Sequence, residues 1–187
     1  MRIVGGQFRG SRLAAPKNDA IRPTSDRVRE ALFNILEHGV ADFEVESARV
    51  LDLFAGSGAL GLEALSRGAK YGLFIDDRAE ARGLIRRNIE SLQLTGIAKI
   101  WRRGATKLGP AGKVEPFDLV FLDPPYGKGL GEEALIAVRE GDWIKAGGIA
   151  VLEEDARSVI DLPDGFEELD RRVYGDTQIV IIRAMKE

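Results

Sequence analysis

Apolar residues recur along the chain with two spacings, one typical of helices and the other of buried strands. Between residues 28 and 36 they fall three and four positions apart, which predicts one face of an amphipathic helix. The preceding Pro23-Thr24-Ser25-Asp26 supplies a hydroxyl cap and an acid for the first turn, and Gly39 is typical of a helix end. From residue 48 onward, short continuous apolar runs alternate with helical segments. Such runs predict strands that are covered on both faces.

This alternation predicts an α/β fold with a doubly wound, largely parallel sheet, because each helix crosses over between two strands. The expected strands are 48–54, 72–75, 97–101, 117–122 and 148–153, and the expected helices are 58–66, 79–94 and 130–139. The end of the chain differs, since the strands expected over 167–174 and 177–184 are separated only by Gly175 and Asp176. That is hairpin spacing, so we expect the sheet to finish antiparallel.

The composition excludes several kinds of active site. The 187 residues include no cysteine and one histidine, so thiolate zinc sites, iron–sulfur clusters, cysteine nucleophiles and histidine-rich metal sites are not expected. The N-terminus lacks the apolar core of a signal peptide, and no apolar run approaches the roughly 18 residues of a membrane span. We therefore expect a cytoplasmic protein that needs neither a metal nor a membrane.

A glycine-rich segment, DLFAGSGALG at residues 52–61, lies between an expected strand and an expected helix. Glycines let the backbone pass close beneath a ligand, and the helix start offers unpaired N–H groups. The segment also matches GxGxxG, with Asp76 at 18 positions after Gly58, so a nicotinamide or flavin site is an alternative. Asp52 argues against that alternative, since a carboxylate beneath the loop repels a pyrophosphate and pairs with an ammonium group. S-adenosylmethionine carries an ammonium and a sulfonium and no phosphate, so it is the expected cofactor.

Asp76, at the end of the next expected strand, is placed to accept hydrogen bonds from both ribose hydroxyls of this cofactor. For Asp76 and the neighbouring Asp77, the structural alternative is a solvated loop or a helix N-cap. The residues expected to contact the cofactor are Asp52, Phe54, Ala55, Gly56, Ser57, Gly58, Asp76 and Asp77.

The segment Asp123-Pro124-Pro125-Tyr126 follows the apolar strand expected at 117–122. Two prolines hold a rigid turn at this strand end, which in an open α/β sheet is where ligands bind. The Asp123 carboxylate and the Pro124 carbonyl are suited to hold both hydrogens of a nucleobase amine, so that its lone pair is aimed, and Tyr126 is suited to stack on the base. We expect these four residues to form the catalytic site of a methyl transfer that depends on alignment and needs no metal.

Four segments together resemble the RsmD family of bacterial 16S ribosomal RNA guanine-N2 methyltransferases, which use S-adenosylmethionine. They are MRIVGGQFRG, RPTSDRVREALFNIL, DLFAGSGALGLEALSRGA and FDLVFLDPPY, and the resemblance runs from residue 1 to about residue 183. It implies a class I methyltransferase fold of about seven strands, with the last antiparallel, and a small N-terminal β-hairpin extension that helps hold RNA. It also assigns Asp52, Gly56, Gly58 and Asp76 to the cofactor, and residues 123–126 to the target base.

Only this resemblance selects guanine as the target. An adenine-N6 methyltransferase acting on DNA or RNA remains the alternative, because the acceptors of Asp-Pro-Pro-Tyr can hold the hydrogens of an adenine amine as well as those of a guanine amine. A dinucleotide-dependent oxidoreductase is a weaker alternative, since it leaves that motif unexplained.

The chain departs from the family pattern at Gly104, where similar proteins usually have an aspartate that accepts from the adenine amine of the cofactor. We expect adenine recognition to rely on the Ala105 backbone, on water or on a neighbouring side chain, and cofactor affinity to be reduced.

The charge is distributed unevenly along the chain. The net charge is −3, yet residues 1–30 carry seven basic residues against three acidic ones, a local net of +4 that leaves −7 for the rest. We expect residues 1–20 to be a hairpin extension that binds RNA, with short strands at 2–4 and 11–15, and residues 21–187 to be the catalytic domain. The alternative for the extension is a merely solvated basic face. The expected RNA contacts are Arg2, Arg9, Arg12, Lys17, Arg22, Thr24 and Lys128. We further expect a monomer that acts on 16S ribosomal RNA, within the 30S subunit or an assembly intermediate.

Overall fold

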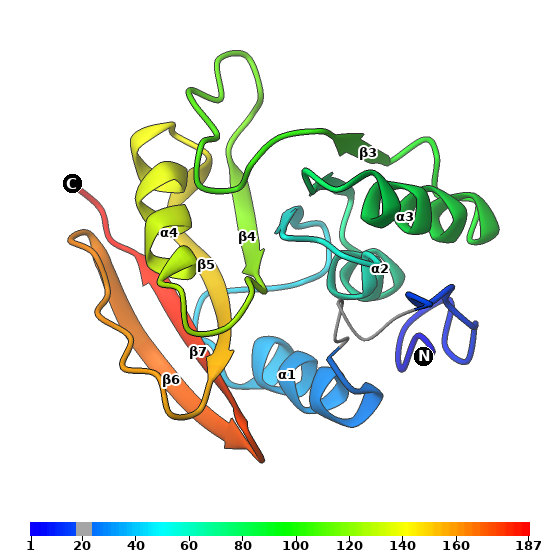
Figure 1. Ribbon diagram of the computed structural model, residues 1–187, viewed down its shortest axis with the longest axis horizontal. Helices are drawn as coiled ribbons and strands as arrows, with labels where there is room; N and C mark the ends of the chain where they lie inside the picture. The colour runs from blue at the N-terminus through cyan, green and yellow to red at the C-terminus, as the bar shows by residue number, and fades with distance from the viewer. Residues whose placement is uncertain (18–23) are drawn as a thin grey trace.

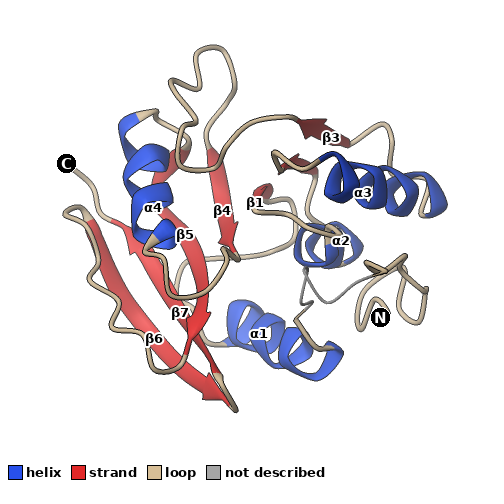
Figure 2. Cartoon of the chain, viewed as in Figure 1, coloured by secondary structure: helices blue, strands red, loops and turns tan. Residues whose placement is uncertain are grey.

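Seven strands form one sheet in the order β3-β2-β1-β4-β5-β7-β6 (Figures 1 and 2). The computed structural model describes residues 1–17 and 24–187. The helices are α1 (Asp26–His38), α2 (Ala59–Ser66), α3 (Ala79–Ser91) and α4 (Leu130–Glu140). The strands are β1 (Arg49–Leu53), β2 (Tyr71–Ile75), β3 (Ala98–Trp101), β4 (Phe117–Leu122), β5 (Ile144–Asp155), β6 (Phe166–Tyr174) and β7 (Thr177–Ala184).

The strand order places the two predicted motifs side by side. β1 pairs in parallel with β2 on one side and with β4 on the other, and Leu53 is in register with Leu122. The chain runs outward from β1 to β3 and then returns to continue on the other side with β4, so the strand order reverses between β1 and β4. In open α/β sheets, ligands bind at the carboxyl ends of the strands at such a point. The segments that follow these two strands are the glycine-rich segment and Asp-Pro-Pro-Tyr.

The predicted class I methyltransferase fold is confirmed, including the antiparallel end of the sheet. β5 is parallel to β4, whereas β7 runs antiparallel to β5 and forms the predicted hairpin with β6. β5 begins at Ile144, four residues before the expected start, and its pairing with β4 shifts register between Phe117 and Leu119. α3 ends at Ser91 rather than at residue 94, because Gln93 adopts a left-handed conformation with φ of 57°.

Two apolar clusters cover the two faces of the sheet. Leu32 of α1, Leu62 of α2 and Ile85 of α3 belong to the cluster on one face, and Leu135 of α4 belongs to the cluster on the other. Within β1 the faces alternate, with Val50 in the first cluster and Leu51 in the second. Among the described residues, no helix has the length and apolar character needed to cross a membrane.

The N-terminal arm (residues 1–17) forms less strand than predicted. Instead of two strands at 2–4 and 11–15, it has a single antiparallel bridge between Arg2 and Arg12. The chain does turn back on itself as expected, with the Ile3 N–H bonded to the Ser11 carbonyl at 3.0 Å. The next N–H groups, those of Val4 and Gly5, bond instead to the Glu63 carboxylate of α2, which stops the ladder. The arm therefore folds against the body of the molecule.

Candidate active site

The glycine loop (residues 54–58) is tightly curled between β1 and α2. Phe54, Gly56 and Gly58 all have positive φ, at 55°, 62° and 82°. For Phe54 this is an uncommon conformation that costs free energy, and such residues gather at functional sites. The Gly56 N–H donates to Oδ2 of Asp76 at 3.0 Å, so the loop is fixed to the end of β2.

Asp52 lies buried beneath the glycine loop, as predicted. Its Oδ2 accepts from the Gly61 N–H at 3.0 Å. Burial raises the pKa of Asp52 to about 8, the nearby Asp76 adds to the rise, and the Gly61 N–H opposes it. A cation bound in the crevice would favour the charged carboxylate. Gly61 itself serves packing, since a Cβ there would lie 2.5 Å from the Phe74 ring.

Asp76 is also buried, at the position predicted for a ribose ligand, and its carboxylate is already paired. Arg78 approaches it with Nε at 3.0 Å from Oδ1 and Nη2 at 2.9 Å from Oδ2. The Arg78 side chain is 46% exposed, so it can leave when another partner arrives. The neighbouring Asp77 is exposed and does not cap α3, whose N-cap is Arg78.

The residues present suit S-adenosylmethionine better than a dinucleotide. Two buried carboxylates, Asp52 and Asp76, border the glycine loop, whose residues 54–58 carry no basic side chain that would balance a pyrophosphate. Beyond β3, Ala105 is buried, while Gly104 faces open space with no atom within 4 Å of a Cβ built there. The structure thus leaves room for the side chain that the family pattern has at this position.

The Asp-Pro-Pro-Tyr segment directly follows β4, and several carboxylates lie near its first residue, Asp123. Burial raises the pKa of Asp123 well above its usual range, and Glu153 and Asp52 raise it further. Pro124 is buried and Pro125 is exposed. The half-buried Tyr126 donates its hydroxyl hydrogen to Oε1 of Glu153 at 2.6 Å. A ring held at its hydroxyl end has few orientations, which suits a stacking surface.

Glu153 and Glu154, at the end of β5, are site residues that were not predicted. Oε2 of Glu153 accepts from the Thr24 hydroxyl at 2.6 Å, while Glu154 accepts from the Gly127 N–H at 2.9 Å. Together they fix the start of α1 and the loop after Tyr126. Their position at a strand end, like that of Asp52, Asp76 and Asp123, is the sequence signal that could have identified them. The loop after Tyr126 also borders a groove of about 280 Å³, whose lining includes Gly129, Glu132 and Val159.

Most of the residues predicted to contact RNA are exposed on the surface. Arg2, Arg9, Arg12, Lys17 and Lys128 are exposed. Arg22 lies outside the described residues. Thr24 is buried with its hydroxyl bonded to Glu153, which makes it a structural residue in the described conformation. Within residues 1–17 and 24–187, no group of three or more acidic or histidine side chains is arranged to hold a metal ion.

Comparison with known proteins gives consistent matches over nearly the whole chain. The family model described as "Conserved hypothetical protein 95" matches residues 1–183. The chain is 41% identical to ribosomal RNA small subunit methyltransferase D of Escherichia coli K12, over 84% of this chain and 76% of that protein. It is 35% identical to the putative rRNA methyltransferase YlbH of Bacillus subtilis, over 98% of both chains. Among solved structures, the putative methyltransferase yhhF of Escherichia coli superposes with a TM-score of 0.84 at 32% identity, covering 100% of this chain and 99% of that one.

Proposed function

This chain belongs to the conserved hypothetical protein 95 family, that is, the RsmD family, and on that premise we propose that it methylates the N2 amine of a guanine in 16S ribosomal RNA with S-adenosylmethionine. The observation that carries the proposal is the pairing of β1 with β4, which sets the glycine loop beside Asp-Pro-Pro-Tyr. The site proposed for the methyl donor and the site proposed for the amine therefore lie side by side at the carboxyl ends of β1 and β4.

When bound, S-adenosylmethionine supplies a methyl group already activated on its sulfonium. What remains for the protein is alignment, which is worth several powers of ten in rate. The Asp123 carboxylate and the Pro124 carbonyl accept the two hydrogens of the guanine amine and direct its lone pair. Because burial and Glu153 raise the pKa of Asp123, this carboxylate also suits the proton that the amine releases as the new N–C bond forms.

Tyr126 supports the base itself. Its hydroxyl is bonded to Glu153 and lies 2.9 Å from the Thr177 hydroxyl, which leaves the ring as a stacking surface. Stacking of a base on an aromatic ring contributes about 1–3 kcal/mol. A guanine within folded RNA must be splayed out of its stack to reach this position.

The RNA side of the proposal depends on the basic arm. Arg2, Arg9, Arg12 and Lys17 are exposed on it, and Lys128 is exposed in the loop after Tyr126. We propose that these residues contact phosphates of 16S ribosomal RNA, in the 30S subunit or an assembly intermediate, and that the protein acts as a cytoplasmic monomer.

The second candidate is adenine-N6 methylation of DNA or RNA. It is favoured by the motif itself, since two acceptors at Asp123 and Pro124 serve an adenine amine as well as a guanine amine. Family membership favours guanine.

Binding and transfer assays test the proposal in two steps. Calorimetry should detect binding of S-adenosylhomocysteine and none of NAD, and the reverse result would indicate an oxidoreductase. Transfer of a labelled methyl group should then occur to unmodified 30S subunits or to naked 16S ribosomal RNA, and comparison of the two identifies the substrate form. Absence of transfer to both would overturn the proposal.

A further inference from the structure

Asn88, a buried residue of α3, joins the arm to the glycine loop. Its Oδ1 accepts from the Ala14 N–H at 2.7 Å, and its Nδ2 donates to the Ala14 carbonyl at 3.2 Å and to the Ser57 carbonyl at 2.9 Å. The side chain is 2% exposed, so water cannot replace these bonds without rearrangement. One side chain thus holds a backbone position of the arm and one of the loop expected to bind the cofactor.

The arm contacts the same loop at a second point. Met1 places its Sδ at 3.9 Å from Oγ of Ser57, whose carbonyl is the one that Asn88 holds. Ser57 is itself buried. Met1 therefore contacts Ser57 directly, whereas Ala14 is connected to the same residue through the Asn88 side chain.

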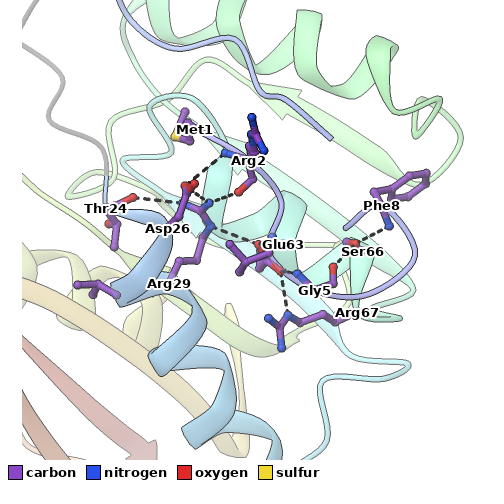
Figure 3. Close-up of polar contacts among 12 residues, drawn as sticks. Met1, Arg2, Gly5, Phe8, Thr24, Asp26, Arg29, Glu63, Ser66 and Arg67 are labelled. Atoms are coloured by element: carbon purple, nitrogen blue, oxygen red, sulfur yellow. Dashed lines mark hydrogen bonds and ion pairs between the residues drawn. The ribbon is translucent and has the colours of Figure 1, made fainter. Parts of the chain in front are cut away.

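A third connection runs through α2, the helix that begins directly after the loop. The Glu63 carboxylate accepts from the Val4 and Gly5 N–H groups, both at 2.9 Å, and pairs with the buried Arg29 of α1 (Figure 3). One turn further, the Ser66 hydroxyl accepts from the Phe8 N–H and donates to the Gly5 carbonyl (Figure 3). Ile3 and Leu13 of the arm are buried in the same apolar cluster as Leu62 of α2. The arm thus packs against α2, the helix that follows the glycine loop.

We propose that Asn88 is a positioning residue through which RNA bound on the arm and cofactor bound at the glycine loop strengthen each other. The inference rests on the proposed function. RNA bound on the arm adds contacts that hold the arm against α2 and α3; Ala14 then keeps the Asn88 amide directed at the Ser57 carbonyl, and the loop stays in the conformation that receives the cofactor. Because such coupling is reciprocal, each ligand must tighten the other by the same factor.

A purely structural role for Asn88 predicts something different. If its only task were to satisfy buried backbone groups, its loss would lower stability and would change the affinity for one ligand equally whether or not the other ligand is present. That ratio is therefore the quantity to measure. S-adenosylhomocysteine is the suitable probe, because it allows binding without turnover.

The experiment measures the dissociation constant of unmodified 16S ribosomal RNA by filter binding, without and with saturating S-adenosylhomocysteine. For the full-length wild-type protein we expect RNA to bind at least about fivefold more tightly with the probe, within the usual range of allosteric coupling. In Asn88→Ala the factor should fall below twofold. Asn88→Asp keeps an acceptor for the Ala14 N–H and removes the donor to Ser57, so it should lose the coupling too. Val138→Ala, a truncation in the cluster on the opposite face of the sheet, is the matched control and should retain it.

Two kinds of result would overturn the inference. A wild-type factor near one, or a factor that persists in both Asn88 variants, would leave the proposed function intact and remove the coupling. Failure of the wild-type protein to bind S-adenosylhomocysteine or RNA at all would overturn the proposed function and the coupling together. If Asn88→Ala does not fold, Asn88→Asp decides alone.

Discussion

Arg78 pairs with Asp76 through two of its guanidinium nitrogens, at 3.0 and 2.9 Å from the two carboxylate oxygens. Asp76 is the carboxylate that we expect to hold the ribose of the cofactor. The same group thus has a partner within the chain, only two residues further along, and that partner competes with the ligand.

Removal of this competitor should improve cofactor binding. A half-exposed ion pair contributes roughly 0.2–1 kcal/mol, so we expect Arg78→Ala to raise the affinity for S-adenosylhomocysteine by a factor between about 1.4 and 5. Asp76→Ala should lower the affinity at least about tenfold, because the ribose and the Gly56 N–H both lose their acceptor. Calorimetry on both variants checks this. Equal losses of affinity would mean that Arg78 holds the ligand with Asp76.

Asp52 should reduce the stability of the free protein at neutral and higher pH. Its pKa is about 8 in the folded chain against an ordinary value of 3.8, so between these values the folded state keeps a proton that the unfolded state has released. Stability contributed by this group therefore falls as the pH rises from about 4 to about 8. Asp52→Asn should raise Tm more at pH 8 than at pH 4.5 and weaken S-adenosylhomocysteine binding at least about tenfold. An equal change in Tm at both values would show that Asp52 is already ionised in the folded protein.

Gly104→Asp should strengthen cofactor binding. The position faces open space and its φ is not positive, so an aspartate can be accommodated and can supply the missing acceptor for the adenine amine. One added hydrogen bond is worth about 1 kcal/mol, which corresponds to roughly a fivefold gain. Gly104→Ala controls for the added Cβ. Tighter binding of S-adenosylhomocysteine by Gly104→Ala than by Gly104→Asp would contradict this explanation.

Basic side chains of the arm should carry a salt-dependent part of RNA affinity. Complete deletion of residues 1–17 would also remove Ile3 and Leu13 from the core, so substitutions are the cleaner test. We expect the double variant Arg9→Glu, Arg12→Glu to bind 16S ribosomal RNA about tenfold more weakly, with a salt slope that is reduced by roughly one to two. The matched control, Arg171→Glu with Arg172→Glu, makes the same charge change on β6. If the control loses as much affinity, net charge rather than the arm is responsible.

Local patterns in the sequence were enough to predict most elements of the fold. β4 (Phe117–Leu122) and β7 are found with the predicted bounds, and β6 begins one residue before the predicted 167, because burial on both faces and tight turns leave a strong local pattern. The start of β5 was missed because Lys145, Ala146 and Gly147 interrupt its apolar run.

Contacts between distant segments could not be predicted in the same way. The bond from Tyr126 to Glu153 depends on β5 lying next to β4, and hydrophobic spacing does not give that order. The docking of the arm depends on Glu63 and Asn88, which in the sequence are simply polar residues within helices. The positions of Asp52, Asp76 and Asp123 at strand ends could be predicted from the sequence; the partners that these side chains find within the chain could not.

The most direct test of the account is the identity of the methylated nucleoside, measured together with its dependence on Asp123. Unmodified 30S subunits and naked 16S ribosomal RNA are incubated with S-adenosylmethionine and protein, and the RNA is digested and analysed by mass spectrometry. The wild-type protein should produce N2-methylguanosine, and Asp123→Asn should produce at least about 100-fold less while it still binds S-adenosylhomocysteine. N6-methyladenosine as the product, or full activity of Asp123→Asn, would contradict the account.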